Sequence, residues 1–140
     1  MPDSTDTVCF IDSNIWLYAF VKSNDTEKTS TASRLIQEVT PVISTQVINE
    51  VCINLLRKAD FSEEQIRSLI DSFYETYRVI QMSRAIMENA SHLRERYALS
   101  FWDSNIVSAA LEANVTVLYS EDMHDGLFVN DRLRIINPLK

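Results

Sequence analysis

Residues 8–17 read Val8-Cys9-Phe10-Ile11-Asp12-Ser13-Asn14-Ile15-Trp16-Leu17, and this stretch decides how the rest of the chain is organised. Its first four residues are apolar and partly β-branched or aromatic, which predicts a short strand buried on both faces. Asp12 follows the strand, and Ser13 or Asn14 is expected to cap a helix that begins there. Open α/β sheets bind ligands at the carboxyl ends of their strands, which makes Asp12 a candidate functional acid. Asp12 as a helix cap alone is the other interpretation, and the choice depends on whether further acids meet it.

The bulk composition is that of one globular domain. The chain has 140 residues, of which 46% are hydrophobic, and we expect a single domain over residues 1–140. The net charge of −7 argues against a protein that coats nucleic acid. It does not exclude an enzyme that acts on nucleic acid, because bound divalent cations would offset clustered carboxylates. Cys9 and Cys52 lie in apolar runs without metal-type spacing, so we expect buried thiols in a reducing cytoplasm.

Several common types of site lack the residues they need. Gly126 is the single glycine, which disfavours a dinucleotide fingerprint, a phosphate loop and a nucleophile elbow. The two histidines, His92 and His124, leave little material for an imidazole zinc site or a Ser-His-Asp triad. The polar start of the chain does not have the form of a signal peptide, and no apolar run is long enough to cross a membrane.

Strand and helix patterns alternate along the chain. The expected strands are residues 8–11, 42–44, 79–80 and 115–119, with 133–136 as a last strand at an edge of the sheet. Helical patterns separate them, and residues 22–31 are expected to form a loop. Such alternation predicts an α/β fold with a mainly parallel central sheet and helices on both faces. If strands 8–11 and 115–119 are neighbours, the acids that follow them lie on the same rim.

Two further acids occupy helical patterns. Glu50 borders the apolar face of residues 47–53, and a carboxylate rarely occupies such a place unless it is paired or binds a metal. The solvent edge of an amphipathic helix is the alternative for Glu50. Asp103 stands in the first turn of an apolar helix, where capping and the helix dipole alone would also favour an acid.

Another acid follows the strand at 115–119. Asp122 stands just after this strand, as Asp12 does after the first, and Glu121 and Asp125 are nearby candidates. A solvated acidic loop is the alternative. A set of carboxylates without cysteine or histidine suits a hard cation such as Mg²⁺ or Mn²⁺. Without a cation, mutual repulsion among such acids raises at least one pKa.

In this order the motifs resemble those of the PIN-domain ribonucleases, and most closely the VapC-type toxins of bacterial toxin–antitoxin pairs. The similar segments are residues 10–15, 49–51, 102–110 and 118–123, followed by Asn137-Pro138. Each motif alone is weak, but the ordered set is fairly specific and covers nearly the whole chain.

The resemblance implies a three-layer α/β/α sandwich and a magnesium- or manganese-dependent endoribonuclease that hydrolyses RNA phosphodiester bonds. The positions that match the family's catalytic and metal-holding acids are Asp12, Glu50, Asp103 and Asp122. Some members of the family place the fourth acid later in the loop, which would select Asp125 for the metal. Supporting polar groups would be Ser13, Asn14 and Ser120.

The resemblance also implies partners, namely an RNA substrate, a small antitoxin protein and a second copy of the chain. The buried thiols and the lack of a long apolar run add the expectation that these partners meet in the cytoplasm and not at a membrane. Apolar residues of segments 30–39 and 63–77, including Phe73, Tyr74 and Tyr77, are candidates for an exposed interface, with the monomer core as the alternative.

Three other functions compete with the toxin. The first two are an RNA-processing PIN nuclease without an antitoxin and a catalytically silent PIN-like binding module. The third is an aspartyl-phosphate phosphatase, which needs a second acid where Asn14 stands.

Overall fold

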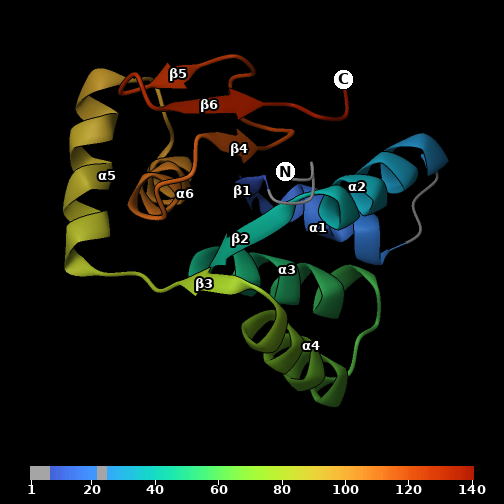
Figure 1. Cartoon of the computed structure of the whole chain (residues 1–140). Coiled ribbons are helices and arrows are strands. Elements are labelled where there is room, and N and C mark those ends of the chain that lie inside the picture. Colours follow the sequence, from blue (N-terminus) through green and yellow to red (C-terminus); the bar gives the residue numbers. More distant parts are fainter. Residues whose placement is uncertain (1–6, 22–24) are drawn as a thin grey trace.

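A six-stranded sheet forms the centre of the computed structural model, which describes residues 7–21 and 25–140 (Figure 1). The strands are β1 Val8–Ile11, β2 Thr40–Ser44, β3 Arg78–Ile80, β4 Val117–Tyr119, β5 Phe128–Val129 and β6 Leu133–Ile136. Their order across the sheet is β3-β2-β1-β4-β6-β5, and all neighbours are parallel except β5 and β6. The predicted mainly parallel sheet is therefore confirmed.

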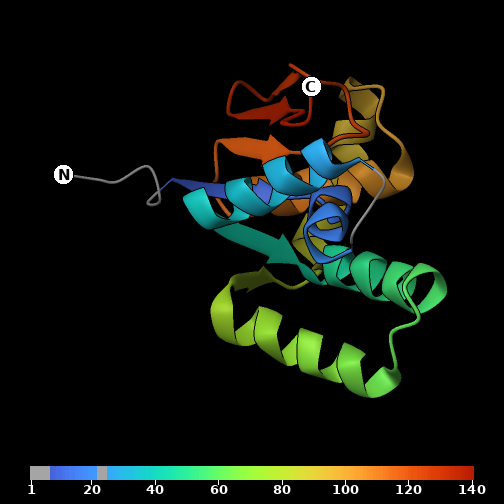
Figure 2. The same ribbon diagram turned by 90° about the vertical axis from the view of Figure 1, so that its right-hand side faces the viewer.

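Helices cover both faces of this sheet. They are α1 Ser13–Phe20, α2 Thr26–Glu38, α3 Thr45–Lys58, α4 Glu63–Thr76, α5 Arg84–Arg96 and α6 Phe101–Glu112. Figures 1 and 2 show α1 and α2 on one side of the sheet and α5 and α6 on the other, while α3 packs against α1 and α4 against α3. Right-handed crossovers require this division, because the chain moves outward from β1 to β3 and then returns to β4. The result is the predicted α/β/α sandwich.

The order in which strands are added to the sheet reverses between the parallel strands β1 and β4. These two strands are neighbours, with Phe10 opposite Leu118 and Ile11 opposite Tyr119. The backbone N–H of Asp12 continues the ladder with a 3.0 Å hydrogen bond to the carbonyl of Tyr119. The segments that follow β1 and β4 consequently share one rim, at the topological switch point where α/β sheets bind ligands.

Trp16 anchors α1 in the core. Its indole Nε1 donates a 3.1 Å hydrogen bond to the carbonyl of Ile11, and its ring meets Phe73 and Tyr77 edge-on at 5.2 and 5.1 Å between centroids. Phe73 is buried and Tyr77 packs against the core, so an exposed interface formed by these two residues was the wrong alternative. Of the three aromatic residues considered, Tyr74 is the one left exposed.

Some local expectations were wrong at the ends of elements. The α2 helix begins at Thr26 with Asp25 as its cap, so the expected loop over residues 22–31 fails from Thr26 onward, while residues 22–24 lie outside the described part. Asp12 itself, and not Ser13 or Asn14, caps α1. The β6 strand is not an edge, because the short β5 strand pairs with its outer side.

Both cysteines lie in the core as expected. Cys9 and Cys52 are free and buried, and burial raises the pKa of the Cys9 thiol to about 12. None of the helices in the described part of the chain is both long enough and apolar enough to cross a membrane.

Candidate active site

Asp12 is the most buried acid of the candidate site. Its exposed fraction is 5%, although it stands at the end of a strand. One oxygen accepts a 2.7 Å hydrogen bond from the backbone N–H of Ser13, and the other accepts a 2.8 Å hydrogen bond from the hydroxyl of Ser120. The first bond is the cap of α1. The second fixes the carboxylate against the end of β4.

The surroundings of Asp12 oppose its ionisation. The pKa of Asp12 is raised to about 6, chiefly by burial. The hydrogen bonds from Ser13 and Ser120 act in the opposite direction, and the neighbouring carboxylates of Glu50 and Asp103 add to the increase. A cap alone would not require two other acids nearby. Asp12 therefore serves as a cap and also belongs to a group of interacting carboxylates, in which a cation would relieve the repulsion.

Glu50 is held by a glutamine one helical turn before it. Gln46 donates hydrogen bonds from Nε2 to the Glu50 carboxylate at 3.2 Å and to the carbonyl of Trp102 at 3.1 Å. Residues four apart share one face of a helix, which allows this contact within α3. The same amide thereby ties the Glu50 carboxylate to the first turn of α6.

Asp103 occupies that first turn of α6. The hydroxyl of Ser100 caps the helix by accepting a 3.1 Å hydrogen bond from the backbone N–H of Asp103. Burial raises the pKa of the Asp103 carboxyl, a hydrogen bond with Ser100 lowers it, and the nearby charge of Asp122 raises it. Asp103 thus occupies the helix position that favours an acid and also interacts electrostatically with Asp122.

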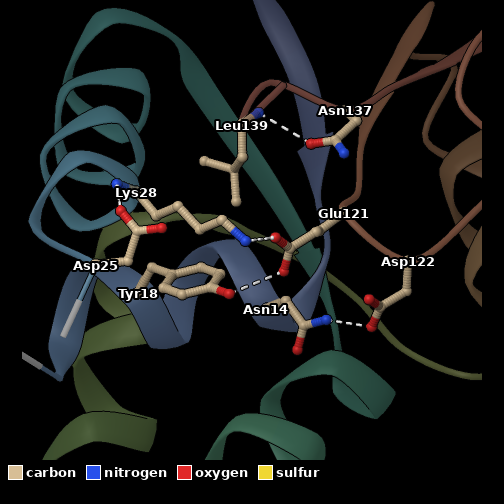
Figure 3. A network of polar contacts seen from close by, with 8 residues as sticks. All are labelled: Asn14, Tyr18, Asp25, Lys28, Glu121, Asp122, Asn137 and Leu139. Atoms are coloured by element: carbon tan, nitrogen blue, oxygen red, sulfur yellow. Dashed lines mark hydrogen bonds and ion pairs between the residues drawn. The ribbon is translucent and has the colours of Figure 1, made fainter. Parts of the chain in front are cut away.

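Asp122 faces α1 (Figure 3). The side-chain amide of Asn14 donates a hydrogen bond to Asp122 Oδ2. Its neighbour Glu121 is engaged differently, since Tyr18 donates a 3.0 Å hydrogen bond to Oε1 and Lys28 lies 2.5 Å from Oε2. Figure 3 shows that these partners come from α1 and α2, on the same side of the sheet.

Asp125 points to the end of the chain. Its carboxylate accepts a 2.7 Å hydrogen bond from the backbone N–H of Asn137 and a 2.8 Å hydrogen bond from Lys140. The ammonium group of Lys140 is the main reason that the pKa of Asp125 is lowered. The electrostatic partners of Asp125 are thus cations, in contrast to those of Asp12 and Asp103.

The structure therefore brings the expected acids into one neighbourhood. Asp12 interacts electrostatically with Glu50 and Asp103, and Asp103 with Asp122. The three supporting polar residues also lie there, because Ser13 and Ser120 bind Asp12 and Asn14 binds Asp122. Nowhere in residues 7–21 and 25–140 do three carboxylate, imidazole or thiol groups come close enough together to hold a metal ion. The donor set is of the kind that a hard cation prefers.

Sequence reasoning missed three residues that contact these acids. Gln46 precedes Glu50 by one helical turn, and Tyr18 follows Asn14 by one turn, so the spacing carried a weak signal for both. Lys28 lies 93 residues before Glu121 in the chain, and no local pattern connects them.

Comparison with known proteins identifies the family. A family model described as the PIN domain matches residues 9–124. No curated protein matches the sequence.

Solved structures with a similar fold include a toxin–antitoxin complex from Klebsiella pneumoniae, with a TM-score of 0.70 and 19% identity over 93% of this chain and 97% of that one. VapBC-1 from nontypeable Haemophilus influenzae has a TM-score of 0.65 and 19% identity over 96% of this chain and 100% of that one. The sarcin-ricin loop cleaving toxin VapC20 of Mycobacterium tuberculosis has a TM-score of 0.64 and 17% identity, over 79% and 86%. Together with the acids on the rim of the sheet, the family match shows that this chain belongs to the PIN domain family.

Proposed function

We propose that this protein is a metal-dependent endoribonuclease and the toxin of a toxin–antitoxin pair. The observation that carries the proposal is the buried Asp12 carboxylate at the switch point of the sheet, in electrostatic contact with Glu50 and Asp103. Burying one ionised group beside two others opposes folding stability, so such an arrangement is hard to explain as a folding device. The PIN family match and the toxin–antitoxin neighbours favour a nuclease.

The cofactor that fits these residues is Mg²⁺ or Mn²⁺. Asp12, Glu50, Asp103 and Asp122 offer oxygen donors alone. The pKa of Asp12 is raised chiefly by burial and to a smaller extent by the charges of Glu50 and Asp103, and a bound divalent cation would favour the ionised carboxylate against both effects. Such a cation, when bound, lowers the pKa of a water ligand and offsets charge on phosphoryl oxygens.

The protein's own groups hold the acids in place for this chemistry. Ser13 and Ser120 orient Asp12, Gln46 orients Glu50, and Asn14 orients Asp122. Asp12, Glu50 and Asp122 thus each have a polar partner that restricts rotation of the carboxylate, which favours the preorganisation that phosphodiester hydrolysis requires. RNA phosphate must approach an acidic chain. Lys58 lines a cavity of about 350 Å³ together with Asn14, the residue that donates a hydrogen bond to Asp122.

The proposal is tested with purified protein and labelled RNA. We expect cleavage in Mg²⁺ or Mn²⁺, none in excess chelator, and none by Asp12→Asn. Arg84→Met is the control, because Arg84 is an exposed side chain on α5 that pairs with Glu88. Cleavage that persists in excess chelator would rule out the metal mechanism. If the wild-type protein binds RNA but never cleaves it, the catalytically silent binding module is the better description.

A small antitoxin is the proposed protein partner, since the neighbours with known complexes are toxin–antitoxin assemblies. Co-expression with the product of an adjacent small reading frame should suppress toxicity and yield a complex that co-purifies. If no such reading frame exists and the protein still cleaves RNA, the RNA-processing nuclease without an antitoxin is favoured. The proposed compartment is the cytoplasm, with which two buried free thiols agree.

A homodimer is the second proposed assembly, and an apolar surface supports it. Five exposed hydrophobic side chains lie around a cavity of about 790 Å³ that Gln46 and Glu50 also line: Ile53, Met82, Met87, Phe101 and Trp102. Exposed apolar patches of this kind mark interfaces. Because Glu50 lines the same cavity, pairing of two copies through this patch would bring the two candidate sites near each other.

Light scattering at micromolar concentration tests the dimer. We expect twice the monomer mass for the wild type and the monomer mass for Met87→Glu. The matched control is Tyr74→Glu, which alters a similarly exposed apolar residue on α4 and should leave the mass unchanged. A wild-type monomer would count against the dimer and leave the nuclease proposal intact.

A further inference from the structure

Three consecutive residues after β4 each form a hydrogen bond with a side chain from an earlier part of the chain. Ser120 donates to Asp12 at the end of β1, Glu121 is held by Tyr18 and Lys28, and Asp122 accepts from Asn14. The nuclease proposal assigns roles to the first and last of these contacts. It gives no role to the contacts of Glu121, which are drawn in Figure 3.

The face of α1 that touches this segment is made by residues one helical turn apart. Asn14 and Tyr18 are separated by four positions and therefore lie on one side of the helix. They contact Asp122 and Glu121, which are adjacent in the chain. Fixing Glu121 on this face consequently also fixes where the backbone of Asp122 begins.

Lys28 completes the enclosure of Glu121. Its ammonium group lies 2.5 Å from Glu121 Oε2 and 5.4 Å from the centre of the Tyr18 ring, while Tyr18 occupies Oε1. Both oxygens of Glu121 thus have a donor, and the two side chains of the ion pair are only 34% and 18% exposed. These contacts direct the Glu121 carboxylate toward Tyr18 on α1 and Lys28 on α2.

The ion pair also removes a like charge from the site. Without Lys28, the Glu121 carboxylate would be uncompensated beside Asp122, which already interacts with Asp103. Repulsion between the neighbouring carboxylates of Glu121 and Asp122 would then favour rotation of the loop and displacement of Asp122.

We infer that Lys28 and Tyr18, acting through Glu121, are positioning residues that hold Asp122 among the acids. The inference rests on the proposed nuclease function for its catalytic consequence. Its structural content, that Lys28 fixes the segment 120–123, can be measured without metal or RNA.

The experiment compares Lys28→Met, Lys28→Arg and the control Arg84→Met, which removes an exposed charge that also has an acidic partner. Three quantities are measured: hydrogen exchange of metal-free protein, the affinity for Mn²⁺ by calorimetry, and kcat and KM for RNA cleavage. Partners that orient metal-binding groups typically change metal affinity or activity by about 10- to 100-fold when removed.

We expect Lys28→Met to speed exchange in residues 120–123 alone, to weaken Mn²⁺ binding about tenfold or more, and to lower kcat with KM changed by less than about threefold. Lys28→Arg should recover most of these losses, and Arg84→Met should match the wild type. If Lys28→Met does not fold, Glu121→Gln provides the test, because it removes the ion pair while keeping an acceptor for Tyr18.

Unchanged exchange in residues 120–123 overturns the inference, whether or not the protein cleaves RNA. The inference is also overturned if Lys28→Met has the same kcat and Mn²⁺ affinity as the wild-type protein. In that case RNA cleavage by the wild-type protein leaves the nuclease proposal intact. Faster exchange over the whole domain would mean that Lys28 supports general stability, which also overturns a positioning role. A wild type that neither binds Mn²⁺ nor cleaves RNA overturns the proposed function instead.

Discussion

The hydroxyl of Ser120 donates a 2.8 Å hydrogen bond to the carboxylate of Asp12, across the point between β1 and β4 where the strand order of the sheet reverses. Ser120 has no exposed surface and Asp12 almost none. This contact joins the ends of β1 and β4, so the most buried acid of the candidate site depends on a residue 108 positions later in the chain.

Ser120→Ala tests that dependence. Losing the hydroxyl leaves Asp12 one donor short, which should lower the free energy of unfolding by about 1–3 kcal/mol. Because the hydrogen bond from Ser120 lowers the pKa of Asp12, the acidic limb of the pH–kcat/KM profile should move to higher pH.

The matched control for this change is Ser108→Ala. Ser108 is another buried serine with a 2.8 Å hydrogen bond, donated to the carbonyl of Ile86 and not to an acid. Its loss should lower stability without moving the pH profile. A profile that moves equally in both variants would contradict the role assigned to Ser120.

Asp12→Asn should raise the stability of the metal-free protein at neutral pH while abolishing cleavage. The folded pKa of Asp12 is about 6 against an ordinary value of 3.8. Between these values the folded state binds more protons than the unfolded state, so the free energy of unfolding falls as pH rises. Asparagine remains a good helix cap and avoids this loss.

The gain from Asp12→Asn should thus be small near pH 4, grow through pH 6 and reach about 1–3 kcal/mol at pH 7. Chemical denaturation of both proteins in chelator across this range measures it. A large loss of stability at pH 7, with RNA cleavage retained, would mean that Asp12 is a structural cap alone.

Most helices and strands could be predicted from the sequence, because the patterns that specify them are local. The apolar run of residues 8–11, for example, is encoded within four residues and forms β1. The predicted loop extended too far, into the start of α2, because the first residues of this helix are polar and show no apolar periodicity. Asp25, which caps the helix, was the available signal. Contacts such as those of Lys28 with Glu121 were beyond prediction, since they depend on how α2 packs on the end of β4.

The choice between Asp122 and Asp125 is open to a direct comparison. Asp122 interacts with Asp103 and Asn14, whereas Asp125 binds Asn137 and Lys140. We expect Asp122→Asn to lower kcat by about 100-fold or more, as loss of a group that orients the reacting centre does, and Asp125→Asn to lower it far less. RNA cleavage rates at saturating Mn²⁺ measure the difference. A greater loss in Asp125→Asn would assign the fourth metal position to Asp125.

The last prediction concerns how an antitoxin would silence the enzyme. A group of acids without its metal attracts a cation, and burial of Asp12 strengthens that attraction by excluding water. An arginine suits the acids because its guanidinium binds carboxylates through two parallel hydrogen bonds and stays protonated. We expect the antitoxin to insert an arginine, or a lysine, among Asp12, Glu50, Asp103 and Asp122, where it would exclude both metal and RNA phosphate.

Competition in the purified complex tests this mode of inhibition. High Mn²⁺ should weaken inhibition, since the cation and the arginine share the same carboxylates. Replacing that arginine by alanine should restore cleavage without dissociating the pair, because the rest of the antitoxin interface is unchanged. An antitoxin that inhibits equally well with no basic side chain near the acids would show that inhibition is steric or acts from a distance.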